Sequence, residues 1–168
     1  MVSTNLIVCE DIRQEAGGKK SLMGVFSSQI ICPSLPLQLN RLCFRVSIET
    51  PKSRPIKSLE IEIAAVDEPS VKIPVPAGNL AKMLKADENP EATHLEYIME
   101  VVATPFPISK EGPIRVSARV NDRKVRVGAI WVKKAVTKPV RAVAHKTMGK
   151  AKRKAPKPHL KRKLSKKA

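Results

Sequence analysis

Proline is the residue that most restricts how this chain folds. The sequence has 14 prolines, and 11 of them fall between residues 33 and 113. A proline has no backbone N–H to donate and its ring clashes with the preceding turn, so it breaks helix interiors. Long helices are therefore excluded over this part of the chain, which leaves strands, turns and short helices.

The segments between the prolines alternate apolar and polar residues with a period of two, which is typical of strands with one buried face. The alternation is clearest in residues 42–48, 59–63, 95–101, 114–120 and 124–131. In the last segment it predicts an inner face of Val125, Val127, Ala129 and Trp131, and an outer face of Lys124 and Arg126.

Residues that accept a positive φ separate several of these strands. Gly17 and Gly18 predict a hairpin turn between a strand over residues 5–14 and a strand over residues 19–32. Asn121-Asp122 predicts a second hairpin turn, between the strands at 114–120 and 124–131.

Two shorter elements complete the expected secondary structure. Residues 71–75 predict an edge strand, with Pro74 at its boundary. Residues 78–87 predict the one helix, because Leu80, Met83 and Leu84 recur with helical spacing and Asn89-Pro90 follows as a stop signal.

These elements predict an all-β fold: an antiparallel two-sheet β-sandwich, Ig-like or C2-like, with one short helix. We expect the sandwich domain to comprise residues 1–132. Residues 133–168 are expected to form a disordered tail rich in Lys and Arg, because they have no aromatic residue with which to build a core.

Four short motifs near the N-terminus occur in a fixed order: Cys9-Glu10-Asp11-Ile12-Arg13, Glu15-Ala16-Gly17-Gly18-Lys19, Ser21-Leu22-Met23-Gly24-Val25-Phe26 and Pro33-Ser34-Leu35-Pro36. They resemble an uncharacterised bacterial and phage-associated family of domains of unknown function. Its members open with a similar acidic-arginine strand, glycine-lysine turn and Leu-X-Gly-Val-Phe strand. The resemblance covers mainly residues 6–36. It implies a bacterial β-sandwich and no particular activity.

The sequence offers little that points to catalysis. It has no serine nucleophile elbow and no HExxH motif. Gly18-Lys19 resembles part of a phosphate loop, but Arg13 stands where such a loop requires its first glycine. We therefore expect no enzymatic activity. Asp11 and Arg13 share one strand face, and we expect a surface or structural ion pair, with a binding site as the alternative.

The cysteines indicate neither a disulfide framework nor a metal site. Cys9, Cys32 and Cys43 are odd in number and lack the paired CxxC spacing of structural zinc sites, so we expect no metal and no cofactor. Cys43 falls on the polar face of its strand, which predicts an accessible thiol. Free cysteines suit a reducing, cytoplasmic location. The uncharged run over residues 21–40 contains two prolines and many polar residues, so we expect no membrane span. An acidic membrane surface could attract the basic tail, but Leu160 and Leu164 form a thin apolar face for anchoring, so we expect no membrane partner.

Positive charge is concentrated at the C-terminus. The chain has 32 Lys and Arg against 15 Asp and Glu, and residues 133–168 contain 15 of the basic residues and none of the acidic ones. A polycation binds a phosphate backbone by releasing condensed counterions, without reading the sequence of bases. The residues expected to bind nucleic acid in this way are Lys133, Lys134, Lys138, Arg141, Lys146, Lys150, Lys152, Arg153, Lys154, Lys157, Lys161, Arg162, Lys163, Lys166 and Lys167.

A second basic face is expected on the last predicted hairpin, from Arg115, Arg119, Arg123, Lys124 and Arg126. It would extend a phosphate-binding track. The favoured alternative is cross-strand pairing with the outward carboxylates of Glu60, Glu62, Glu96 and Glu100.

The sequence therefore predicts a non-enzymatic, cytoplasmic protein that associates with nucleic acid, including the nucleoid. The sandwich would act as an anchor and the tail would bind phosphates non-specifically. The alternative is a protein–protein adaptor, in which the sandwich binds an unknown protein and the tail serves solubility or localisation.

Overall fold

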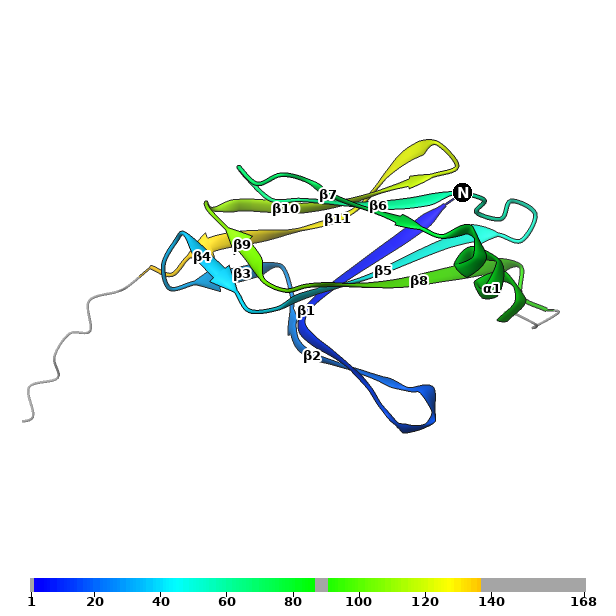
Figure 1. The fold of residues 1–168 in the computed structure, drawn as a ribbon, viewed down its shortest axis with the longest axis horizontal. Coiled ribbons are helices and arrows are strands. Elements are labelled where there is room, and N and C mark those ends of the chain that lie inside the picture. The colour runs from blue at the N-terminus through cyan, green and yellow to red at the C-terminus, as the bar shows by residue number, and fades with distance from the viewer. Residues whose placement is uncertain (1, 87–90, 137–168) are drawn as a thin grey trace, which may run out of the picture. The chain divides into compact units, whose positions relative to one another are not determined.

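Two β-sheets account for most of the residues that the computed structural model describes, which are residues 2–86 and 91–136 (Figure 1). The four-stranded sheet has the order β2 (Lys20–Phe26), β1 (Ser3–Gln14), β5 (Leu42–Pro51) and β8 (His94–Ala103). The five-stranded sheet has the order β3 (Gln29–Cys32), β11 (Arg123–Lys134), β10 (Gly112–Val120), β6 (Leu59–Ala64) and β7 (Val71–Val75). The expected disordered tail lies outside the described residues, apart from its first four positions.

The two sheets pack face to face, which confirms the predicted β-sandwich (Figure 1). In the part of the chain that the structure describes, every strand pair is antiparallel except β3–β11, which is parallel. The short strands β4 (Leu37–Leu39) and β9 (Phe106–Ile108) pair with each other, and neither was expected from the sequence. The compact unit that contains these sheets runs to Val136.

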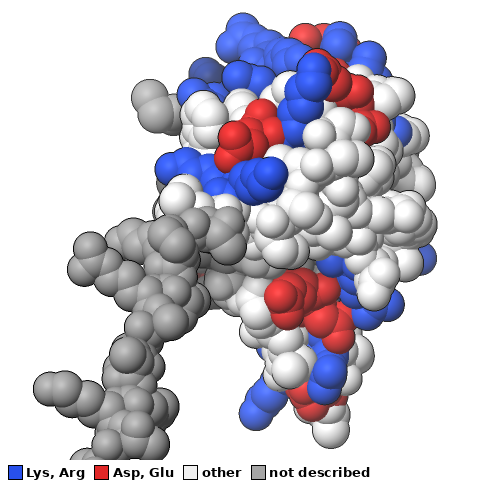
Figure 2. Space-filling view, turned by 90° about the vertical axis from the view of Figure 1, so that its left-hand side faces the viewer, with Lys and Arg blue, Asp and Glu red and all other residues white. Residues whose placement is uncertain are grey.

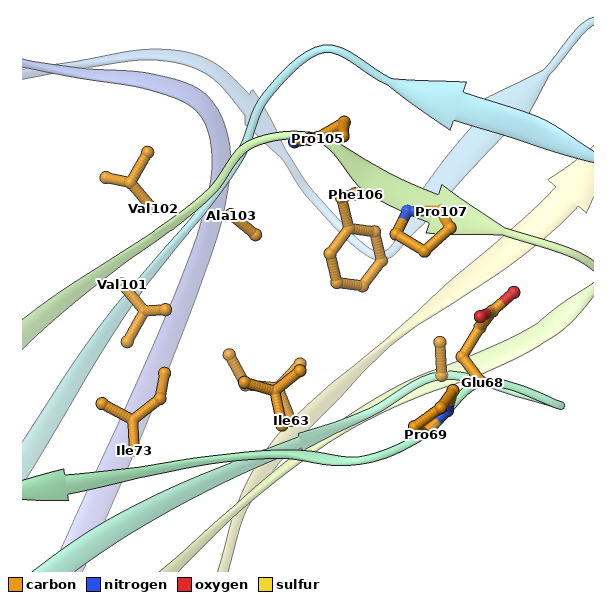
Figure 3. Close-up of a pocket in the computed structure, with 12 residues that line it drawn as sticks. Ile63, Glu68, Pro69, Ile73, Val101, Val102, Ala103, Pro105, Phe106 and Pro107 are labelled. Atoms are coloured by element: carbon orange, nitrogen blue, oxygen red, sulfur yellow. The ribbon is translucent and has the colours of Figure 1, made fainter.

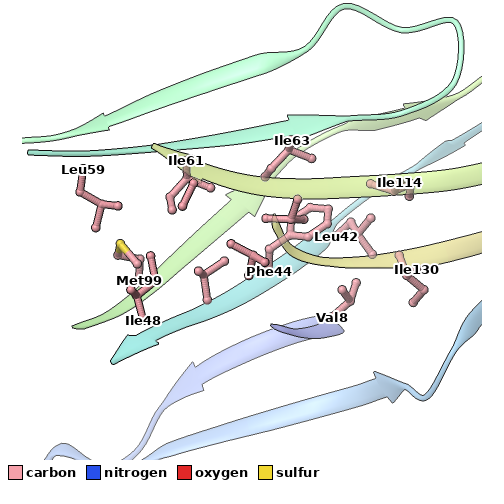
Figure 4. Packing of buried hydrophobic residues seen from close by; sticks show 14 of the residues in the cluster. Val8, Leu42, Phe44, Ile48, Leu59, Ile61, Ile63, Met99, Ile114 and Ile130 are labelled. Atoms are coloured by element: carbon pink, nitrogen blue, oxygen red, sulfur yellow. The ribbon is translucent and has the colours of Figure 1, made fainter. Parts of the chain in front are cut away.

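The inner faces of the sheets form one apolar core (Figure 4). The alternation along β5, β6, β8 and β10 is confirmed. Leu42, Phe44, Val46 and Ile48 of β5 are each 0 % exposed, and Ile61 of β6 is 1 % exposed. Burying one such side chain contributes roughly 1.5–3 kcal/mol, so these rows are what holds the two sheets together.

The segment 19–32, expected as one strand, is two strands in different sheets. The chain bends at Ser27-Ser28, which separate β2 from β3. Before the bend the chain pairs with β1, and after it the chain crosses to the other sheet and pairs with β11. The period of two continues through the bend because Ile30 and Cys32 are buried in the new sheet, so the alternation did not reveal the crossing.

The inner face predicted for residues 124–131 is correct only as far as Val127. Ser117 pairs with Arg126 but Val116 pairs with Gly128, so Val127 is an extra residue, a β-bulge. One extra residue reverses which side chains point inward. Beyond the bulge Ile130 is buried, and Trp131 is 53 % exposed. The prediction that Trp131 lies in the core is therefore wrong.

The predicted helix is confirmed as α1 (Ala77–Ala86), which follows the edge strand β7. Leu80 is buried in the core, and Met83 is partly buried and packs against the core. Within the described residues no helix has the length and apolar character needed to cross a membrane.

Tyr97 lies in the core and links β8 to the loop before β6. The Ile56 backbone N–H donates a hydrogen bond to Tyr97 Oη over 3.1 Å, and both residues are buried. Tyr97→Phe leaves that amide without an acceptor, so the free energy of unfolding should fall by about 1–3 kcal/mol. Equilibrium urea denaturation measures it. An unchanged free energy would contradict the role of this hydrogen bond.

Candidate nucleic-acid interface

The outer face of the five-stranded sheet gathers basic side chains from three strands. The pairing register places Arg119 of β10 opposite Lys124 of β11, and Ser117 opposite Arg126. Residues paired in this way point to the same side of a sheet. The Lys and Arg that the strands of this sheet direct outward are Lys72, Arg115, Arg119, Lys124, Arg126 and Lys133.

Two glutamates on β6 neutralise part of this face. Lys124 Nζ lies 2.6 Å from Glu62 Oε2, which also accepts a hydrogen bond from Ser117 Oγ over 3.1 Å. Arg119 Nε lies 3.9 Å from Glu60 Oε1. The expected cross-strand pairing is thus correct for Glu60 and Glu62.

The other two expected partners, Glu96 and Glu100, lie in the other sheet on β8. Glu100 pairs there with Lys20 and, at 2.7 Å, with Arg45, and Glu96 accepts a hydrogen bond from Ser47. They cannot neutralise the five-stranded sheet, so that part of the prediction is wrong. On the strands of the five-stranded sheet, six outward basic residues face two outward glutamates, a surplus of four positive charges.

Figure 2 shows Lys and Arg gathered in the upper part of the view, where this sheet lies, with fewer Asp and Glu among them. No ion pair joins Arg115, Arg126 or Lys133 to a carboxylate among residues 2–86 and 91–136. Their charges are free to act on an external anion.

Arg123 does not belong to this face. It pairs with Val120, whose side chain is buried, so it lies on the opposite side of β11 from Lys124. There it lines a hollow at the end of the sheet together with Arg54 and Val2. The structure thus brings together four of the five residues expected on the second basic face.

Lys133 and Lys134 belong to β11, although we expected them in the tail. They pair with Ile31 and Cys32 of β3, and the Lys134 backbone N–H donates to Glu111 Oε1. The domain boundary expected after Val132 therefore falls inside a strand. The other tail residues expected to bind nucleic acid lie outside the described residues.

Trp131 is the functional candidate that sequence reasoning missed. It lies on the outer face, directly opposite Gln29 of β3 and Pro113 of β10. The neighbouring Ile31 is also about half exposed, at 53 %. The signal that could have revealed this is Gly128, because a glycine inside a strand often marks a bulge. A Cβ at Gly128 would lie 2.9 Å from the side chain of Leu6 on β1.

Asp11 forms the surface ion pair that was expected, with one additional partner. Arg13 Nε lies 3.1 Å from Asp11 Oδ2, and Arg41 Nη1 lies 2.5 Å from Asp11 Oδ1. Hydrogen bonds from Arg13 and then Arg41 hold the pKa of the Asp11 carboxyl below its ordinary value. All three side chains are at least partly exposed.

Cys43 is fully buried, so the prediction of an accessible thiol is wrong. It lies opposite Cys9 of β1, and both are 0 % exposed. Val25 pairs with Cys9 on the adjacent strand β2, and Val102 pairs with Cys43 on β8, so the two valines flank the cysteines. Burial raises the pKa of the Cys9 thiol to about 11 and raises that of Cys43. Among the described residues no three His, Cys, Asp or Glu side chains gather as metal ligands.

A second surface feature is an apolar groove of about 320 Å³ between the edge strands of the two sheets (Figure 3). Phe106 of β9 points into it. Val71 and Ile73 of β7 line one side, and Val101 and Val102 of β8 line the other. Among the described residues that line the groove, Glu68 alone is charged, and its carboxylate accepts a hydrogen bond from Ser109.

The pKa of Glu62 tests the electrostatics of the basic face. Hydrogen bonds from Lys124 and then Ser117 hold this pKa below its ordinary value of 4.5. Lys124→Gln should move it up toward 4.5, as measured by NMR titration of the carboxyl carbon. A carboxyl with a lowered folded-state pKa stabilises the fold above its unfolded-state pKa. The free energy of unfolding should therefore be higher for the wild type than for Lys124→Gln near neutral pH. This difference should disappear as the pH falls through the folded-state pKa of Glu62. An unshifted pKa would show that Lys124 does not bond Glu62 in solution.

Comparison with known proteins gives one finding that covers most of the chain. No curated protein matches the chain. The model of a family described as "Family of unknown function (DUF6941)" matches residues 5–133, from the third residue of β1 to the penultimate residue of β11. The N-terminal resemblance therefore extends over the whole sandwich, and the chain belongs to this family of unknown function.

Proposed function

We propose that this protein binds nucleic acid through its phosphate backbone and catalyses no reaction. One observation carries the proposal: residues 133–168 contain 15 Lys and Arg and no Asp or Glu. Each phosphate that these residues neutralise releases counterions, so the driving force does not depend on the base sequence. Binding is then similar for double-stranded DNA and RNA, and it weakens steeply as the salt concentration rises.

The basic face of the five-stranded sheet supports this function. It carries a surplus of four positive charges over the sheet's outward glutamates. β11 contributes Lys124, Arg126 and Lys133 to that face, and the basic C-terminal segment follows β11 in the sequence. In this proposal the sandwich anchors the segment, and the protein works in the bacterial cytoplasm or on the nucleoid.

Salt titration tests the contribution of the C-terminal segment. Six charges are removed from the full chain by changing to Gln the residues Lys152, Arg153, Lys154, Lys161, Arg162 and Lys163. Each phosphate contact contributes about 0.9 to the slope of log affinity against log salt, so the slope for a DNA duplex should shrink by up to about five. Fluorescence anisotropy of a labelled DNA duplex between 50 and 200 mM salt (about a 4-fold range) measures the affinity and therefore this slope.

The matched control exchanges Lys for Arg and Arg for Lys at the same six positions, which keeps every charge. It should bind as the wild type does. Equal affinity and equal slope for the Gln variant and the wild type would refute the proposal.

The alternative function is that of a protein–protein adaptor, and the apolar groove between β7 and β8 is the observation that favours it. Val71 and Val102 at this groove are each about half exposed. Apolar side chains at a sheet edge suit an extended peptide that adds a strand and places its side chains in the groove.

A pull-down from bacterial lysate distinguishes the adaptor from the nucleic-acid binder. If the adaptor function holds, a specific protein should copurify after nuclease treatment and be lost with Val102→Asp, which places a charge in the groove. The control Val25→Asp changes a similarly exposed valine on β2 and should keep the partner. A partner that nuclease removes would count against the adaptor.

A further inference from the structure

We propose that the outer face of the five-stranded sheet around Trp131 binds single-stranded nucleic acid, with one base stacked on the indole ring. This inference rests on the proposed function and adds the ligand class and the residue that selects it. A polycationic segment alone neutralises phosphates and does not distinguish single strands from duplexes. An exposed aromatic ring beside the same charges does distinguish them, because it requires an unstacked base.

The surroundings of Trp131 suit a base with phosphates on either side. Lys133 lies two residues further along β11 on the same face, so its Cα is about 6.6 Å from the Cα of Trp131 along the strand. Arg115 is the diagonal neighbour on β10, because Trp131 pairs with Pro113, and diagonal neighbours lie about 7–8 Å apart. Both basic residues lie within reach of a backbone whose base rests on the indole.

The two basic neighbours are available for phosphate. Neither Arg115 nor Lys133 forms an ion pair with a carboxylate among the described residues. The glutamates on the strands of this face, Glu60 and Glu62, pair with Arg119 and Lys124 at the far end of the strands. Near the ring, Glu111 precedes β10 and accepts a hydrogen bond from the Lys134 backbone N–H, but it forms no ion pair with Arg115 or Lys133.

The charge of this face also argues for nucleic acid over a protein partner. The cores of protein–protein interfaces are enriched in Trp and Arg but depleted of Lys and of charged residues as a whole. Around Trp131 the exposed side chains include Gln29, Ile31, Arg115 and Lys133. An aromatic ring and an isoleucine among cations form a surface on which a base stacks and its phosphates are neutralised.

Because Trp131 is the only tryptophan of the chain, its fluorescence reports on this position alone. The full-length protein is titrated with a 20-nucleotide oligo(dT), a 20-nucleotide oligo(U) and a 20-base-pair DNA duplex. Both single strands should quench the indole emission in a saturable way, because neither the ring nor its charged neighbours read the sugar. The duplex, whose bases are stacked on one another, should quench it little.

Substitution at the same position tests whether stacking contributes to affinity. Trp131→Ala should weaken oligo(dT) binding by about 5- to 150-fold, which is the range for loss of one stacked base. Duplex binding should stay within about 2-fold of the wild type, since phosphate contacts are kept. Trp131→Phe should restore part of the single-strand affinity. Thermal unfolding of each variant checks that the fold is intact.

Val25→Ala is the matched control, because Val25 is 55 % exposed but lies in the other sheet, on β2. It should bind oligo(dT) as the wild type does. The stacking site is refuted if Trp131→Ala binds oligo(dT) like the wild type and oligo(dT) leaves the wild-type Trp131 emission unchanged. In that case salt-dependent binding of the duplex would still support the proposed function. If the full chain binds neither duplex nor single strand at 50 mM salt, about the lower end of the range over which phosphate contacts dominate, both proposals fail together.

Discussion

The pairing of β10 with β11 determines what the five-stranded sheet presents to solvent. Up to Arg126 the strands pair residue by residue and direct Arg119 and Lys124 outward. At Val127 one extra residue enters β11, and from there the side chains that would have pointed inward point outward. The core is then filled by Ile130 and Val132, and Trp131 is left on the surface. The candidate interface exists because both halves of β11 contribute to one face.

The outer faces of the two sheets differ in how their charges are arranged. On the four-stranded sheet Glu100 is shared by Lys20 and Arg45, and Asp11 is shared by Arg13 and Arg41. On the five-stranded sheet Arg115, Arg126 and Lys133 have no such carboxylate within the described residues. Exposed ion pairs contribute only about 0–1 kcal/mol, so leaving these charges unpaired costs the fold little. Fold stability therefore neither requires nor forbids the surplus, and the proposed binding of phosphates would make use of it.

The two candidate surfaces occupy different parts of the sandwich. The basic face covers the outside of one sheet, and the apolar groove opens between the edge strands β7 and β8. The groove lacks the positive charge that phosphates need, and the basic face lacks the uncharged core of a protein interface. Binding of nucleic acid and binding of a protein would therefore not exclude one another, and the variants at Trp131 and Val102 separate them.

Much of the fold followed from local patterns that tertiary contacts reinforce. The alternation along residues 42–48, 59–63, 95–101 and 114–120 predicted the buried faces, because none of these four strands has an extra, bulged residue within those ranges. Asn121 and Asp122 predicted the turn between β10 and β11, because a two-residue hairpin turn needs a positive φ and both residues have one. The bend at Ser27-Ser28 and the bulge at Val127 were not predicted, because a period of two does not record a change of sheet or an extra residue.

The sequence by itself determined the all-β class, the positions of most strands and the concentration of positive charge at the C-terminus, all of which depend on residue type and spacing along the chain. Only the tertiary structure decided which glutamates face which cations, that Cys43 is buried and that Trp131 is exposed. Those properties depend on which strand lies beside which and in what register. Glu60 and Glu100 are similar in sequence context, yet one lies beside Arg119 and the other beside Arg45 because their strands belong to different sheets.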